Sequence, residues 1–218
     1  MSQGVLPFKY EEEKKETGMT ALAGLPIYLD LATVMGLGES VENLHIKQRG
    51  WTDKQISLSL IMLNLAAGDC VDDLKKLEGD DGFCRVLRRI EQKWMKRREQ
   101  REIDRRWRKE RDQTLPSPSA VFRYLSAFHD QDQEGERIAG KAFIPIPNDH
   151  LRGLMRVNGD MLAFIQRCHP QQVATLDQDA TLVETAKRDA LYSYKDYKAY
   201  QPLNTWWAEQ ASVVYPSG

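Results

Sequence analysis

The chain has 218 residues, of which 41% are hydrophobic and 29% are charged, a composition typical of a folded globular protein and not of a disordered one. Its longest apolar run, residues 58–67, contains two polar side chains and is far shorter than the roughly 20 residues that cross a bilayer, so we expect no membrane-spanning segment. The formal net charge is only −1, but the charges are unevenly distributed along the chain.

The first 20 residues are polar, and we expect a flexible N-terminus there. They contain neither the basic start nor the continuous apolar core of a secretory signal. The three cysteines, Cys70, Cys84 and Cys168, are odd in number and far apart, which favours reduced thiols over a disulfide framework. We therefore expect a cytoplasmic protein.

Residues 21–36 are the first segment with apolar side chains at helical spacing. Pro26 is expected to break this helix early, and the glycines Gly36 and Gly38 are expected to stop it.

A second helix is predicted over residues 51–67, where Thr52 and Gln55 have the spacing of a capping box. Apolar residues at helical spacing predict a further short helix over residues 71–77. We assign residues 21–114 to one helical region.

A strongly basic segment spans residues 85–111, with thirteen basic residues against five acidic ones. Its net charge of +8 leaves −9 for the rest of the chain. Clustered arginines neutralise phosphates and release counterions, so the segment indicates DNA as a partner; a solvated helix that binds nothing is the alternative. The side chains that we expect to contact phosphates are Arg97, Arg98, Arg101, Arg105, Arg106 and Arg108.

Residues 115–170 form a connecting region that we expect to be helical. Ser117 as N-cap and Pro118 as first helical residue predict one helix start, and a long amphipathic helix is predicted to begin at Asn148. Residues 129–141 have the composition of a loop.

After residue 170 the pattern changes to the alternation of strands, at 175–183 and again at 191–194, so the expected fold class is α+β. Within the first strand, alternation points the side chains of Asp177 and Asp179 to the same face. Two carboxylates roughly 7 Å apart repel each other unless a cation, a donor or water compensates them. A divalent metal ion is one explanation, and a solvated acidic edge is the alternative.

Several separated motifs resemble bacterial insertion-sequence transposases of the DDE class, whose catalytic domain is RNase H-like. Residues 174–210, ATLDQDATLVETAKRDALYSYKDYKAYQPLNTWWAEQ, resemble the start of that domain. Residues 50–82 and 115–128 resemble the family's N-terminal helical region and the segment before its catalytic domain. Asp196 stands where the family's Tyr-Lys-Gly motif has glycine.

The resemblance implies a helical DNA-binding region at 21–114, followed at 171–218 by the first strands of an RNase H-like domain. It makes Asp179 the first catalytic aspartate, with Asp177 as an accompanying acid, and implies Mg²⁺ or Mn²⁺ as cofactor. The implied substrate is DNA at transposon ends, which a nucleoid-associated protein would meet in the cytoplasm.

The family completes its site with a later aspartate and a glutamate, which these 218 residues do not contain, so we read the catalytic domain as truncated. We therefore expect this polypeptide alone neither to cleave nor to join DNA. The alternatives are a DNA-binding fragment that regulates or inhibits transposition, as a homodimer or together with intact transposase, and a helical interaction module.

Overall fold

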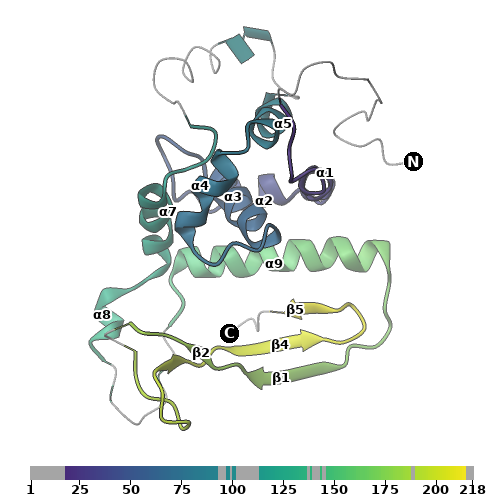
Figure 1. The fold of residues 1–218 in the computed structure, drawn as a ribbon. Helices are drawn as coiled ribbons and strands as arrows, with labels where there is room; N and C mark the ends of the chain where they lie inside the picture. Colours follow the sequence, from purple (N-terminus) through teal and green to yellow (C-terminus); the bar gives the residue numbers. More distant parts are fainter. Residues whose placement is uncertain are drawn as a thin grey trace. The chain divides into compact units, whose positions relative to one another are not determined.

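The computed structural model describes residues 18–92, 97–98, 100–101, 113–136, 138, 143, 146–187 and 190–214. A flexible N-terminus is expected at residues 1–20, and residues 1–17 of it lie outside the described residues. Contacts between residues divide the chain into two compact units, Met1–Ala127 and Phe128–Gly218. The first unit is helical and the second contains helices and antiparallel strands, which confirms the predicted α+β class (Figure 1).

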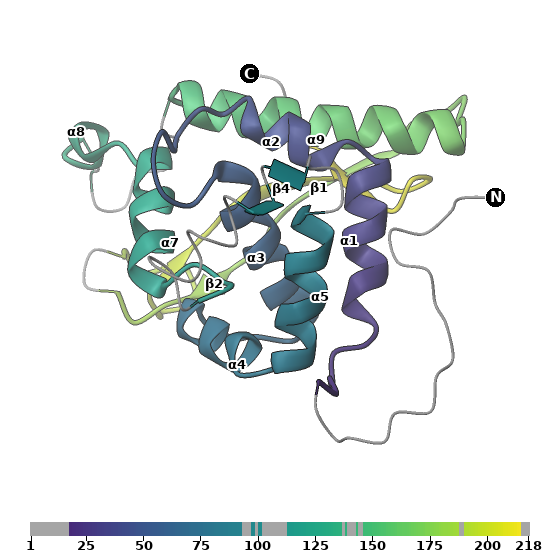
Figure 2. The same cartoon turned by 90° about the horizontal axis from the view of Figure 1, so that it is seen from above.

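Unit 1 is built from helices, and Figures 1 and 2 both show α1 and α5 side by side. A short 3-10 helix at Val71–Asp73 leads directly into α4, and another at Ser126–Phe128 spans the unit boundary. The helices are α1 (Leu25–Val34), α2 (Leu37–Glu42), α3 (Asp53–Leu65), α4 (Leu74–Glu78), α5 (Asp81–Gln92) and α7 (Pro118–Leu125).

Local hydrogen bonds fix the helix starts that the sequence predicts. The Thr52 hydroxyl accepts the backbone N–H of Gln55 at 3.2 Å, and the Gln55 side chain accepts the N–H of Thr52 at 3.0 Å, so the capping box of α3 is confirmed. Ser117 accepts the N–H of Ala120, and Pro118 is the first residue of α7, also as predicted. The short helix expected at 71–77 is confirmed by the 3-10 turn and α4.

The core of unit 1 takes one or more large apolar side chains from each of five helices. Leu29 of α1, Ile56 of α3, Leu74 of α4, Phe83 of α5 and Val121 of α7 are almost completely buried. Burial of a side chain of this size stabilises a fold by about 1.5–3 kcal/mol. These residues therefore hold helices together that are far apart in the chain.

The first helix differs from the prediction in two respects. Pro26 does not break it but lies in its first turn, where the missing N–H would have no intrahelical partner. Gly36 follows α1 with a φ of 72°, a left-handed conformation that glycine adopts without strain. Gly38, however, does not end a helix, because it lies inside α2, which the sequence did not predict.

The described part of unit 2 combines two helices with two small antiparallel sheets. In the three-stranded sheet β4 lies between β1 and β5, and the two-stranded sheet pairs β2 with β3 (Figure 1). The elements are α8 (Gln131–Glu134), α9 (Asp149–Cys168), β1 (Leu176–Ala180), β2 (Val183–Glu184), β3 (Ala199–Tyr200), β4 (Leu203–Trp207) and β5 (Ser212–Val214).

The two sheets share one continuous register. Leu176 lies opposite Trp207 and Ala180 opposite Leu203, and the β2–β3 pair continues the same numbering with Val183 opposite Tyr200. Between the two pairs, the N–H of Thr181 donates to the carbonyl oxygen of Pro202 at 3.1 Å. The segment 176–185 therefore forms one long antiparallel ladder with 198–207, which we call the long ladder.

The helix α9 begins as predicted, because the side chain of Asn148 accepts the N–H of Leu151 at 2.9 Å. The side-chain amide of Asn158 donates to the carbonyl oxygen of Val213 at 3.1 Å and so ties α9 to β5. None of the helices in the described part of the chain combines the length and apolar composition that crossing a membrane requires.

Two sequence predictions for unit 2 are wrong. Residues 129–141 were expected to be a loop, but they include α8, because the Asp130 carboxylate accepts the N–H groups of Asp132 and Gln133 and starts a turn of helix. Residues 191–194 were expected to be a strand, but they contribute only an isolated bridge between Tyr192 and Lys198, since the chain turns immediately afterwards.

Candidate functional site

The two aspartates selected from the sequence lie on β1 and share one face of the sheet. Strand alternation places Asp177 and Asp179 on the same side, opposite Trp206 and Asn204 of β4. Both carboxylates are exposed to solvent. The predicted arrangement of this strand is thus present, with the acids accessible to a dissolved ion or a substrate.

The groups close to Asp179 come from neighbouring backbone and from β4. One carboxylate oxygen of Asp179 accepts the N–H of Ala180 at 2.8 Å. The side-chain amide of Asn204, directly across the ladder, donates to the hydroxyl of Thr181 at 3.3 Å. Asp177, Asp179 and Asn204 together offer carboxylate and amide oxygens, which are the ligand types that Mg²⁺ and Mn²⁺ prefer.

Within the described ranges, no group of three or more His, Cys, Asp or Glu side chains is arranged to hold a metal ion. The pair Asp177 and Asp179 therefore has no third acidic ligand among these residues, and Asn204 is the additional oxygen donor that the sheet register places beside them. Such a set suits a cation that keeps several water ligands, as Mg²⁺ commonly does.

The opposite face of the same strands contains the buried residue of β4. Thr205 is only 3% exposed, and its hydroxyl accepts a hydrogen bond of 3.0 Å from the side-chain amide of Gln178, its cross-strand neighbour. Because Gln178 lies between the two aspartates in sequence and shares the face of Thr205, strand alternation directs both acids to the other face.

Glu209 secures the beginning of β1 against the chain that follows β4. Its two carboxylate oxygens accept the hydroxyl of Thr175 at 2.6 Å and the N–H of Thr175 at 2.9 Å. Both donors stabilise the charged form and so lower the pKa of Glu209 from its ordinary value, and the Thr175 hydroxyl has the larger effect. The two hydrogen bonds between Glu209 and Thr175 fix where β1 starts, and with it which side chains of β1 lie on the face of the two aspartates.

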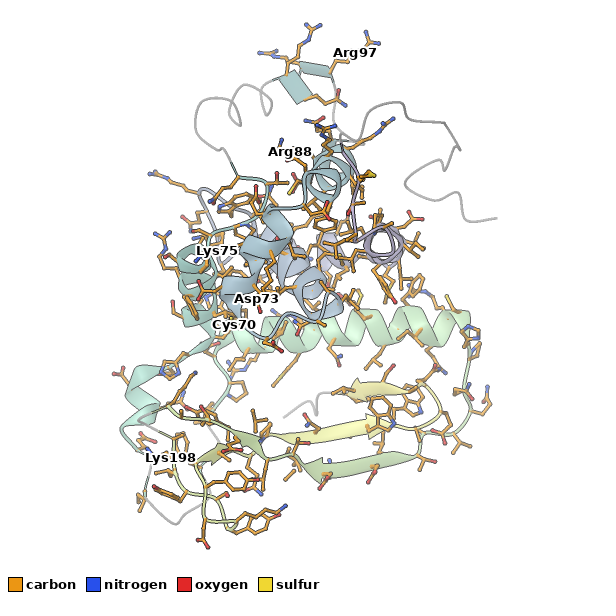
Figure 3. The ribbon with its side chains drawn as sticks, viewed as in Figure 1. Cys70, Asp73, Lys75, Arg88, Arg97 and Lys198 are labelled. Atoms are coloured by element: carbon orange, nitrogen blue, oxygen red, sulfur yellow. The ribbon has the colours of Figure 1, made fainter. Side chains whose placement is uncertain are left out.

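Three of the six arginines selected from the sequence are described in the structure. Arg97, Arg98 and Arg101 have helical backbone and exposed side chains. Figure 3 shows the Arg97 side chain pointing away from the helices of unit 1. The other three, Arg105, Arg106 and Arg108, lie outside the described residues.

Two sets of hydrogen bonds lie beside these arginines, both within unit 1. The side-chain amide of Gln100 donates to the carbonyl oxygen of Gln92, the last residue of α5, at 2.9 Å. After the basic segment, the Glu78 carboxylate accepts the N–H groups of Thr114 and Leu115 at 2.8 and 2.7 Å. The chain before α7 is therefore attached to α4.

Neither Asn204 nor Glu78 was indicated by the sequence. Asn204 is an isolated polar residue in a strand, and only the pairing of β4 with β1 brings it opposite Asp179. Glu78 is one of many acidic residues in the chain, and its partners lie 36 and 37 residues away. No local spacing indicates contacts of this kind.

No family model matches the chain, and no curated protein and no solved structure matches it at a significant level. The resemblance to DDE transposases therefore rests on the motifs of the sequence. What the protein does must be inferred from the residues of the candidate site and of the basic segment.

Proposed function

We propose that this chain belongs to a DDE transposase of an insertion sequence, with Asp179 as its first metal ligand and Asp177 as the accompanying carboxylate. The observation that carries the proposal is the placement of both acids on one exposed face of the first strand of a sheet. The expected RNase H-like domain begins with a strand that carries its first catalytic acid in this way. The α+β class and the helical unit that precedes the sheet are compatible with it.

A second observation concerns the family's Tyr-Lys-Gly motif, to which Tyr194, Lys195 and Asp196 correspond. Asp196, which replaces the glycine expected after Tyr194 and Lys195, has a φ of 63°. This left-handed conformation is the one in which glycine is unstrained, so the backbone has the shape that the family's glycine would require.

In the proposed function, Asp177 and Asp179 hold Mg²⁺ or Mn²⁺, and Asn204 stands beside them as an uncharged oxygen donor. In an intact member of the family, such an ion would activate water for attack on a phosphodiester at the element end. Because the described residues place no third acid beside Asp177 and Asp179, we expect this chain alone not to cleave DNA. The exposed arginines of the basic segment bind phosphates of the same DNA and hold it to unit 1.

The second candidate function is DNA binding without cleavage, by a chain that regulates or inhibits transposition as a homodimer or together with intact transposase. It is favoured by the lack, among the described residues, of a third acid beside Asp177 and Asp179. Mg²⁺- or Mn²⁺-dependent cleavage or strand transfer that is abolished by Asp179→Asn would show that this chain is itself catalytic and would contradict the expected inactivity of the chain alone. DNA binding with no such activity supports the regulatory one.

Duplex binding at several salt concentrations tests the DNA-binding role common to both. We expect the affinity to fall steeply with salt and the double substitution Arg105→Glu and Arg106→Glu to reduce the slope of log K against log salt by about 2. Arg156→Glu, at an exposed position of α9, is the matched control and leaves the slope unchanged. An unchanged slope in the double variant would show that these arginines do not contact phosphates.

A further inference from the structure

A short hairpin at residues 191–199, which we call the tyrosine hairpin, projects from the end of the long ladder. The N–H of Ser193 donates to the carbonyl oxygen of Tyr197 at 2.8 Å, and the N–H of Asp196 donates to that of Ser193 at 3.2 Å. These bonds close a tight turn that has Tyr194 and Lys195 at its tip.

Aromatic rings and lysines meet in this hairpin. Tyr192 and Tyr194 are each 73% exposed, which is unusual for side chains with so much apolar surface. The Lys195 ammonium lies 5.7 Å from the centre of the Tyr194 ring. Outside the hairpin, the Lys187 ammonium lies 5.8 Å from the centre of the Tyr200 ring. A cation on one face of an exposed ring leaves the other face available for stacking.

The tyrosine hairpin lies on the face of the long ladder that carries the acids. Lys198 pairs with Tyr192 on one side and accepts a backbone hydrogen bond from Thr185 on the other, so the three side chains share a face. Thr185 is six residues beyond Asp179 in one unbroken register, which keeps it on the same face. The separation along the strand is roughly 20 Å, or about six nucleotides of stacked DNA.

We propose that the tyrosine hairpin binds unpaired nucleotides of DNA: Tyr192 and Tyr194 stack on bases, while Lys195 and Lys198 contact phosphates. This inference rests on the proposed function, because it makes the hairpin the place where the strand attacked beside Asp179 is held. The substrate class is therefore DNA with an unpaired or splayed end, not an intact duplex alone.

The chemistry of the hairpin favours unpaired DNA over a duplex or a protein partner. Bases in a duplex already stack on each other, so they offer no ring face, whereas an unpaired base gains about 1–3 kcal/mol by stacking on an aromatic side chain. Two lysines against the single acid Asp196 leave the tip positively charged, which complements phosphates. An apolar protein surface would require neither the lysines nor exposed tyrosines.

The test measures binding of labelled oligothymidine and of a duplex of the same length by fluorescence anisotropy, with the full chain. We expect Tyr192→Ala with Tyr194→Ala to weaken oligothymidine binding by about tenfold or more and to leave duplex binding unchanged. The pair Tyr192→Phe and Tyr194→Phe keeps the rings and therefore keeps the affinity. Lys195→Ala with Lys198→Ala lowers the salt slope for oligothymidine by about 0.7 for each phosphate that is no longer neutralised.

Tyr28→Ala, which removes a 47% exposed tyrosine from α1, is the control outside the hairpin and leaves oligothymidine binding unchanged. Absence of oligothymidine binding, or equal affinity of the wild type and the double alanine variant, overturns the inference, whatever else the tyrosines bind. A different result would contradict the proposed function: no binding of the duplex, or duplex binding that does not depend on Arg105 and Arg106. Tyrosine-dependent binding of oligothymidine would still support the hairpin in that case.

Discussion

Asp179 of β1 lies directly opposite Asn204 of β4, on the exposed face of the sheet. Opposite residues of an antiparallel pair have their Cβ atoms about 4.5–5.5 Å apart, so a carboxylate and an amide are held side by side by the backbone alone. Asp177 adds a second carboxylate from the same strand. The pairing of β1 with β4 thus places three side chains that carry oxygen atoms on one face of the sheet.

This set of ligands predicts where a metal ion binds. In an NMR titration with Mn²⁺, we expect paramagnetic broadening centred on Asp177, Asp179 and Asn204. Asp179→Asn should weaken binding by at least about tenfold, since even groups that only orient a ligand contribute that much. Glu184→Gln removes an exposed acid from β2 and should change nothing. Broadening centred on another part of the chain would contradict the site.

The carboxylate of Glu78 is predicted to be a main attachment of the chain that follows the basic segment. Glu78→Ala leaves the N–H groups of Thr114 and Leu115, both almost fully buried residues, without an acceptor, and should destabilise unit 1 by about 3 kcal/mol. Glu78→Gln keeps one acceptor oxygen and should cost about half as much. Hydrogen exchange of the segment before α7 should increase accordingly, whereas Glu39→Ala, at an exposed site in α2, should not affect it.

The lowered pKa of the Asp80 carboxyl leads us to expect that unit 1 loses stability in acid. Partial burial raises the pKa of its carboxyl, but hydrogen bonds from the Phe83 N–H, the Thr20 hydroxyl and the Ala21 N–H outweigh burial, and the net pKa is lowered below 3.8. The stability that the carboxylate contributes is therefore present above pH 3.8 and is lost as the pH falls through the lowered pKa.

Asp80→Asn should flatten this acid dependence in unfolding experiments while retaining the N-cap of α5, because asparagine caps helices as well as aspartate does. Asp80→Ala should lower the stability of unit 1 at neutral pH by about 1 kcal/mol or more. If the Asp80→Asn variant loses stability in acid as steeply as the wild type, a group other than Asp80 causes the acid dependence.

Asp196→Gly is predicted to stabilise the tyrosine hairpin. A non-glycine residue with a φ of 63° is strained, so glycine should raise the stability of the turn by about 1 kcal/mol despite its larger entropy in the unfolded chain. Slower hydrogen exchange at Ser193 and Ala199, whose N–H groups bond across the hairpin, is the measurement. Asp196→Ala is the matched control and should give no gain, because alanine keeps a Cβ atom at this positive φ and lacks the carboxylate with which aspartate can bond locally.

Two helical glycines should respond in opposite directions to alanine. A Cβ on Gly82 of α5 would lie 2.5 Å from the carbonyl oxygen of Met19, so Gly82→Ala should destabilise unit 1 by about 2 kcal/mol. A Cβ on Gly159 of α9 meets nothing within 4 Å, so Gly159→Ala should stabilise α9 by about 0.5–1 kcal/mol. Thermal unfolding of both variants distinguishes the two effects, and a stabilised Gly82→Ala variant would contradict the close approach.

Helix starts were predictable because their stabilising contacts are local. Thr52 with Gln55, and Asn148 with Leu151, are each three residues apart, so the sequence contains both partners of the cap. Strand alternation predicted in the same way that Asp177 and Asp179 would share a face. Pro26 was misjudged because a proline is tolerated in the first turn of a helix, and the first turn could not be located from propensity alone.

The sequence by itself therefore determined the α+β class, the starts of α3, α7 and α9 and the common direction of the two acids, since each depends on residues close together in the chain. Only the tertiary structure decided that Asn204 lies opposite Asp179 and that Glu78 attaches the chain after the basic segment. These contacts join residues 25 or more positions apart, and the packing that selects one register or one partner leaves no periodic trace in the sequence.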